Sequence, residues 1–198
     1  MDSGQRRPYR MVARASNTAA TAEHIIDAAV ETFWERPTDR ISLDDVARRA
    51  GVSVQTVIRR FGGRDGLVRA AIERESERVR VDRDPAAARD VAGAIDQLIT
   101  HYEAMGDAVL RMLAEEVRAP DLREVAESGR RFHREWCESV FAATLASLTG
   151  TARHRRLVQL VAVCDVHTWR LLRRDGGLSR AETELALLEL IEPLLEGS

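Results

Sequence analysis

Apolar residues recur along the chain at steps of three and four, the spacing of a helix that buries one face. In residues 21–36 this pattern runs through Ile25, Ile26, Ala29, Val30, Phe33 and Trp34. Pro37 predicts the end of this helix, because the residue before a proline disfavours the helical conformation. No segment alternates apolar and polar residues as a half-buried strand does. The pattern therefore predicts an all-α protein.

Two short helices are predicted next. Ser42, with Asp45 three residues later, resembles a capping box in which aspartate replaces the usual Glu or Gln, and it predicts a helix to about residue 50. Gly51 suits a left-handed turn, and Ser53 suits the N-cap of a third helix that ends at Phe61 before a Gly-Gly pair. Helices this short need a neighbour to pack against.

The rest of the chain is predicted to form a connecting helix and a C-terminal bundle. The run "DRDP", which ends at Pro85, marks the predicted domain boundary. Longer helices are predicted over 87–105, 107–118, 121–148, 152–174 and 179–195, with breaks at Gly106, Pro120, Gly150 and Gly176-Gly177. The predicted organisation is a disordered basic arm (1–17), a helix-turn-helix DNA-binding domain (18–63), a connecting helix and linker (64–84), and a ligand-binding and dimerisation domain (85–198).

Composition narrows the class of protein. The 198 residues are 44% hydrophobic, which is enough to bury a core, and they contain arginine but no lysine. Residues 1–64 hold 11 arginines against 8 acidic residues, whereas residues 65–198 hold 19 against 24. The first third is therefore the basic end. No apolar run is long enough for a membrane span or a signal peptide, so we expect a soluble cytoplasmic protein with no membrane partner.

The third short helix has two chemically different faces. Its predicted apolar stripe is Val54, Val57, Ile58 and Phe61, which leaves Gln55, Thr56, Arg59 and Arg60 on the other side. Amide and hydroxyl groups near a helix N-terminus can read base edges in a DNA major groove, and guanidinium groups can hold phosphates. A plain helical hairpin with a solvated arginine face is the alternative.

The segment "ISLDDVARRAGVSVQTVIRRFGGRDGLVRAAIE", residues 41–73, preceded by "EHIIDAAVETFWER", resembles the N-terminal DNA-binding domain of the TetR family of transcriptional regulators. The resemblance covers residues 21–73. It implies an all-α homodimer whose N-terminal helices bind a double-stranded DNA operator and whose C-terminal bundle binds a small-molecule effector that releases the DNA. Most members of the family are repressors.

The resemblance also implies roles for particular residues. Ser42 would contact phosphate, Val54, Gln55 and Thr56 would face bases, Arg59 and Arg60 would reach the DNA backbone or base edges, and Arg64 stands where the family usually has a phosphate-facing lysine. This chain departs from the family at Ile58, which replaces a frequent tyrosine, and at Val54, which replaces a frequent lysine. Both changes concern the affinity for DNA, and nearby arginines can compensate electrostatically for the contacts that the tyrosine and the lysine would make.

The C-terminal helices are predicted to form the dimer and to hold the effector. Residues 157–172 and 185–195 are apolar on more than one face, so each helix needs a second partner besides its own core. This pattern predicts a homodimer through the last two helices, whose two-fold symmetry would match that of a palindromic operator. A buried helix in a monomer is the alternative. Candidate ligand-binding residues are Tyr102, Met105, Met112, Phe132, Trp136 and His167, which suggest a mainly apolar ligand, although core packing is the ordinary role of each.

A metal-responsive regulator is a further alternative. His133 and Cys137 are spaced i, i+4, and Cys164 and His167 are spaced i, i+3, so facing helices could present a tetrahedral zinc-type set. A ligand-independent architectural DNA-binding module is another possibility. The sequence contains no glycine-rich phosphate loop, nucleophile elbow or paired-carboxylate helix motif, so neither an enzyme nor a bound cofactor is predicted.

Overall fold

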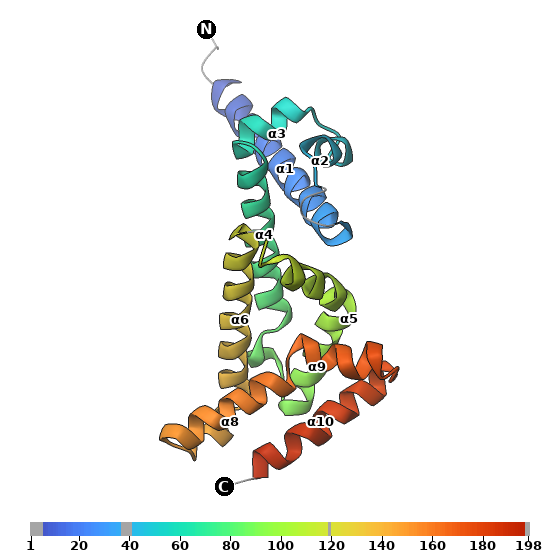
Figure 1. Ribbon diagram of the computed structural model, residues 1–198. Helices are drawn as coiled ribbons and strands as arrows, with labels where there is room; N and C mark the ends of the chain where they lie inside the picture. The colour runs from blue at the N-terminus through green and yellow to red at the C-terminus, as the bar shows by residue number, and fades with distance from the viewer. Residues whose placement is uncertain (1–5, 37–40, 119, 197–198) are drawn as a thin grey trace. The chain divides into compact units, whose positions relative to one another are not determined.

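The computed structural model describes residues 6–36, 41–118 and 120–196 (Figure 1). Within these ranges the chain forms helices and turns and no strand, which confirms the predicted all-α class. The chain divides into two compact units, Met1–Glu75 and Ser76–Ser198, and the division lies inside helix α4 (Arg64–Asp82). Each unit has its own hydrophobic core.

Helix α1 (Arg6–Glu35) begins well before the predicted start near residue 21. Residues 6–17 are helical, which differs from the disordered arm predicted over residues 1–17, while residues 1–5 lie outside the described ranges. Arginine, alanine and methionine are good helix formers, and Pro8 lies in the first turn, where its missing N–H is not needed. Contact between this segment and DNA stays a prediction.

Helices α2 (Leu43–Arg49) and α3 (Val54–Phe61) have the predicted caps. The Ser42 hydroxyl accepts a hydrogen bond from the Asp45 amide at 3.1 Å, and the Ser53 hydroxyl accepts one from the Thr56 amide at 3.2 Å. Gly62 ends α3 in the left-handed conformation with φ 76°. These local interactions explain why both helices start and end within about a residue of the predicted positions.

The first unit has a core made by α1, α2, α3 and the start of α4. Its fully or nearly fully buried residues are Ile25, Ala28, Ala29, Ile41, Val46, Ala47, Val57, Leu67 and Ala71. A Cβ atom at Gly66 would lie 1.8 Å from the carbonyl oxygen of Phe61, so only glycine allows α4 to begin this close to the end of α3.

The second unit contains α5 (Val91–Glu115), α6 (Pro120–Val140), α7 (Ala142–Ala146), α8 (Gly150–Val163), α9 (Val166–Arg170) and α10 (Arg180–Glu196), with a short 3-10 turn (Pro85–Ala87) before α5 and a π-helical turn (Leu171–Asp175) after α9. The predicted break at Gly106 is wrong, because α5 runs through it. The predicted helices 121–148 and 152–174 are each divided, at Phe141 and at Asp165. Asp165 starts α9 by accepting a hydrogen bond from the His167 amide at 2.9 Å.

The core of the second unit surrounds α5. This helix packs against α6, α9 and α10, and α8 packs against both α6 and α10 (Figure 1). The largest fully buried side chains are Trp136, Trp169, Phe141, Ile95, Leu98, Ile99, Leu122, Leu145, Leu157 and Leu160. Residues from helices far apart in the sequence therefore share one core.

Candidate DNA-binding surface and effector site

The exposed face of α3 carries Gln55, Ile58 and Arg59. Val57 is fully buried, and Val54 packs partly buried against the core of the first unit. Val54 therefore packs as its place in the predicted apolar stripe implies, and its contact with bases stays a prediction. The structure corrects the assignment of Ile58 to that stripe, because its side chain is 46% exposed. Successive residues turn by about 100° around a helix, which puts Ile58 at the edge of the apolar stripe and not at its centre.

The two arginines of α3 differ from several other arginines of the first unit, which form ion pairs. Arg36 lies 3.2 Å from Asp45, Arg49 lies 2.7 Å from Glu35, and Arg74 lies 2.9 Å from Asp27. Arg59 and Arg60 have no ion-pair partner among the residues that the structure describes, and α3 itself contains no acidic residue. Arg59 is exposed, whereas Arg60 is partly buried and its Nε atom makes no hydrogen bond within the described residues.

The hydroxyl groups of the predicted site take part in helix caps. The Ser42 hydroxyl lies 2.8 Å from a carboxylate oxygen of Asp45, and this hydrogen bond, assisted by Arg36 and Arg48, holds the pKa of Asp45 below its usual range. Thr56 is partly buried, and its hydroxyl lies 2.9 Å from that of Ser53. A phosphate or base contact by Ser42 or Thr56 would have to be made alongside these bonds.

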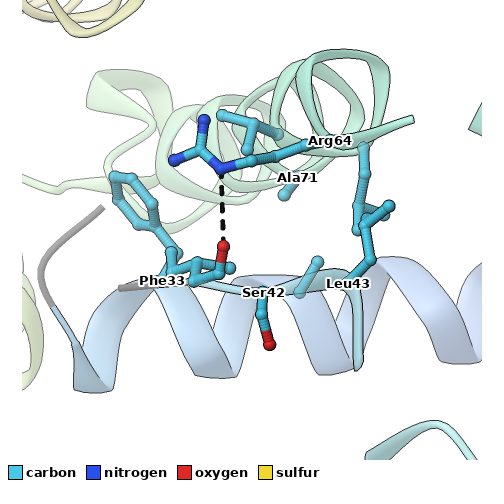
Figure 2. Close-up of a pocket in the computed structure, with 9 residues that line it drawn as sticks. Phe33, Ser42, Leu43, Arg64 and Ala71 are labelled. Carbon is cyan, nitrogen blue, oxygen red and sulfur yellow. Dashed lines mark hydrogen bonds between the residues drawn. The ribbon is translucent and has the colours of Figure 1, made fainter. Parts of the chain in front are cut away.

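Arg64 is held against the segment that precedes α2. Its Nε–H donates to the carbonyl oxygen of Ile41 at 3.4 Å (Figure 2). The guanidinium also forms a 3.9 Å ion pair with Asp65. The side chain lines a small, mainly apolar recess with Ala29, Phe33, Ile41, Ser42, Leu43, Leu67, Val68 and Ala71. Its predicted contact with phosphate stays a prediction.

In the second unit, several of the predicted effector-site residues surround a buried arginine. Arg83 is only 4% exposed, and its guanidinium carbon lies 4.7 Å from the ring centre of Trp136, 5.3 Å from that of Phe132 and 5.9 Å from that of Tyr102. One terminal nitrogen of Arg83 lies 3.1 Å from Nδ1 of His133. Sequence reasoning missed Arg83, because the run "DRDP" has the composition of a solvated linker.

The other predicted effector-site residues lie in different surroundings. Met112 is buried and Met105 is partly buried on α5. The prediction for His167 is wrong: this side chain is exposed, and its Nδ1 lies 2.7 Å from Asp165. His101 on α5, which the sequence-based predictions do not include, is partly buried. Burial, together with the charges of Arg83 and Arg78, lowers the pKa of this imidazole to about 3.

The helices that carry the candidate metal ligands meet, but they do not assemble a metal site. Cys137 Sγ lies 3.9 Å from Nε2 of His133, and a hydrogen bond from Cys164 lowers the pKa of the Cys137 thiol to about 6. The same interaction and burial raise the pKa of Cys164. His167 is directed to solvent by the Asp165 cap, and no group of three or more His, Cys, Asp or Glu side chains in the described residues is arranged to hold a metal ion. The predicted metal-ligand set is therefore wrong.

Comparison with known proteins agrees with this architecture. Residues 25–71 match the family described as "Bacterial regulatory proteins, tetR family". This match covers α2 and α3 together with parts of α1 and α4, so it identifies the helix-turn-helix segment of the first unit as one of the TetR type. The chain is 35% identical over 65 residues, 33% of its length, to an uncharacterised HTH-type transcriptional regulator of Mycobacterium tuberculosis. It is 27% identical over 126 residues, 61% of its length, to the HTH-type transcriptional regulator AlkX of the same species. The matched segments span 32% and 58% of these two curated relatives.

Solved structures share the fold over most of the chain. A TetR-like transcriptional regulator from Rhodococcus matches with a TM-score of 0.66 and 20% identity, covering 91% of this chain and 98% of that one. A TetR-family regulator from Streptomyces coelicolor matches with a TM-score of 0.68 and 20% identity, covering 89% and 80%. These likenesses show that the two units of the chain share the fold of these regulators. In the described residues, no helix has the length and apolar character needed to cross a membrane.

Proposed function

We propose that the protein is a ligand-responsive transcriptional repressor that binds a palindromic operator as a homodimer. The observation that carries this proposal is the surface of α3, where Gln55 and Arg59 are exposed and where neither Arg59 nor Arg60 has an acidic partner among the described residues. A cationic surface without internal counter-charges favours phosphate, and an exposed amide near the helix start can read a base edge.

The homodimer is supported by apolar side chains that the last helices leave exposed. They are Val158 on α8 (45% exposed), Leu171 on the π-helical turn (62%), and Leu185 and Leu190 on α10 (57% and 46%). Isolated exposed leucines are common on protein surfaces. These four lie within the segments 157–172 and 185–195, whose sequence predicts an interface, and a two-fold partner would cover the corresponding helices of the other subunit.

An effector site in the second unit is supported by buried groups around Arg83. Tyr102 and Trp136 are 4% and 2% exposed, and Phe132 is partly buried beside them. Ligand sites in proteins combine such aromatic side chains with a small number of polar groups. We propose that a mainly apolar small molecule binds here and weakens operator binding.

The decisive experiment is selection of bound sequences from random double-stranded DNA, using the purified full-length protein. We expect enrichment of a palindrome with two half-sites, and weaker binding of that palindrome when a library of metabolites is added. A Gln55→Ala variant should select a degenerate base at the position that the side chain reads. Failure to enrich any sequence would favour an architectural DNA-binding module.

A further inference from the structure

Arg83 is a buried cation for which no carboxylate among the described residues supplies a counter-charge. Its side chain is 4% exposed, and among the described residues it forms no ion pair. A charge removed from water is strongly disfavoured unless an opposite charge or several hydrogen bonds compensate it. Ring faces attract a cation, but this attraction is weaker than the hydration that burial removes.

The neighbouring His133 does not supply that anion. Nδ1 of His133 lies 3.1 Å from a terminal nitrogen of Arg83, which can only donate. Nδ1 must therefore accept, and Nε2 carries the proton and donates to the carbonyl oxygen of Val161 at 3.2 Å. The Cys137 sulfur hydrogen-bonds to Cys164 and His133 and makes no hydrogen bond to Arg83 within the described residues, although the charge of Arg83 is one of the smaller causes that lower the pKa of the Cys137 thiol.

Two N–H donors of this cluster, one on Arg83 itself and one on Trp136, lack acceptors within the described residues. Nε of Arg83 and Nε1 of Trp136 are both buried and make no hydrogen bond within the described residues. The guanidinium carbon lies 4.7 Å from the centre of the Trp136 ring, so both donors belong to the same small region. Buried polar groups are normally paired, so a cation with one unpaired N–H of its own and a second unpaired N–H beside it calls for an anionic acceptor.

We propose that this cluster binds the carboxylate group of an organic acid. The oxygens of the acid accept hydrogen bonds from Arg83 and from Trp136 Nε1, and the rings of Tyr102 and Phe132 contact its apolar part. A carboxylate carries one negative charge, which neutralises the one buried positive charge, whereas a phosphate dianion would leave an excess charge. The role of this acid as an effector rests on the proposed function, but its binding does not.

The test compares acids with neutral molecules of the same shape on the full-length protein. Isothermal titration calorimetry and thermal shift would be measured with benzoate, octanoate and dodecanoate, with the corresponding amides, and with inorganic phosphate. At least one acid should bind about tenfold or more tightly than its amide, and phosphate should bind weakly or not at all. The proposal is overturned if every acid and amide pair binds equally or not at all, or if phosphate binds best.

Three variants test which side chains donate hydrogen bonds to the carboxylate. Arg83→Met should abolish the preference for acid over amide, and without ligand it should melt at the same or a higher temperature than wild type, because an uncompensated charge is removed. Arg80→Met is the matched control: Arg80 lies 6.0 Å from the Phe132 ring centre but is exposed, so the preference should persist. Trp136→Phe keeps a ring and removes the N–H, and should weaken acid binding several-fold.

The variants also keep the proposal testable if one of them fails to fold. Should Arg83→Met unfold, the acid and amide comparison in wild type and in Trp136→Phe still decides. An unchanged acid preference in either variant that folds would overturn the assignment. DNA release is measured separately. If an acid binds without releasing DNA, the binding site is supported and its role as an effector site is rejected. If neutral compounds release DNA with no preference for acids, the proposed function is supported and this site is rejected.

Discussion

The indole ring of Trp169 fills the space that a side chain at Gly106 would occupy. A Cβ atom built on Gly106 would lie 2.5 Å from Cζ3 and 2.8 Å from Cη2 of the ring. The ring cannot easily move, because Trp169 is fully buried and its Nε1–H donates to Glu103 at 3.1 Å. Glu103 in turn accepts a hydrogen bond from Arg173 at 2.8 Å. The contact between α5 and α9 therefore depends on a glycine in the middle of a helix.

Replacing Gly106 by alanine should destabilise the protein. Crowding of a packed core costs about 1–3 kcal/mol, which outweighs the gain of up to about 1 kcal/mol from the better helix propensity of alanine. Gly129 on α6 provides the control, because it is exposed and a Cβ there meets nothing within 4 Å. Gly129→Ala should be neutral or stabilising. Urea unfolding of both variants measures the difference, and an equally stable Gly106→Ala variant would contradict this packing.

Gly106 illustrates the difference between features of the fold that can be predicted from the sequence and features that cannot. The ends of α2 and α3 could be predicted, because Ser42, Ser53 and Gly62 determine them through bonds to residues three or four positions away. Gly106 was interpreted as a helix break because glycine weakens a helix. Its actual role depends on Trp169, which is distant in sequence, and no local pattern indicates such a contact.

Arg59 provides a test of phosphate contact. If its exposed guanidinium neutralises one DNA phosphate, Arg59→Ala should weaken binding to all DNA sequences alike and flatten the slope of log K against log salt concentration by about 0.9. Arg130→Ala is the control, because it removes the same charge from the second unit, where Arg130 pairs with Glu116 at 3.0 Å. Operator titrations at several salt concentrations measure both slopes, and equal slopes for wild type and Arg59→Ala would exclude a phosphate contact.

The exposed leucines of α10 provide a test of the homodimer. Leu190→Asp should convert a dimer to a monomer, because a charge would be buried in an apolar interface. Val117→Asp is the matched control, since Val117 is 78% exposed on a different part of the second unit and should leave the oligomeric state unchanged. Analytical ultracentrifugation distinguishes the species. A monomeric wild-type protein, or a dimeric Leu190→Asp variant, would argue against this interface.

The candidate effector site could be predicted only in part. Tyr102, Phe132 and Trp136 were chosen as large aromatic residues, and the structure brings them together around Arg83. Arg83 itself lies in a charged segment between predicted helices, and its burial results from residues on α5 and α6. The spacing of His167 from Cys164 suggests a shared face in the alternative metal set, but the Asp165 cap starts a new helix and turns the imidazole outward. Spacing predicts a shared face only where one helix continues.

His101 should make stability depend on pH. Burial and the charges of Arg83, Arg78 and His133 lower its pKa from 6.5 to about 3, so the folded protein holds the neutral imidazole. Between these two pKa values the unfolded chain binds a proton that the folded chain does not, and the free energy of unfolding must fall as the pH falls. The contribution disappears above about pH 6.5, where both states are neutral.

Comparison with His101→Gln isolates this contribution, because the carboxylates that also titrate in acid are present in both proteins. From pH 6.5 toward pH 3, wild type should lose stability relative to His101→Gln by at most about 1.4 kcal/mol per pH unit. His154→Gln is the control, since His154 is exposed on α8 and its replacement should leave the pH dependence unchanged. Urea unfolding at several pH values measures the three curves. Parallel curves for wild type and His101→Gln would show that the imidazole is protonated equally in the folded and unfolded states, and that α5 opens this side chain to water.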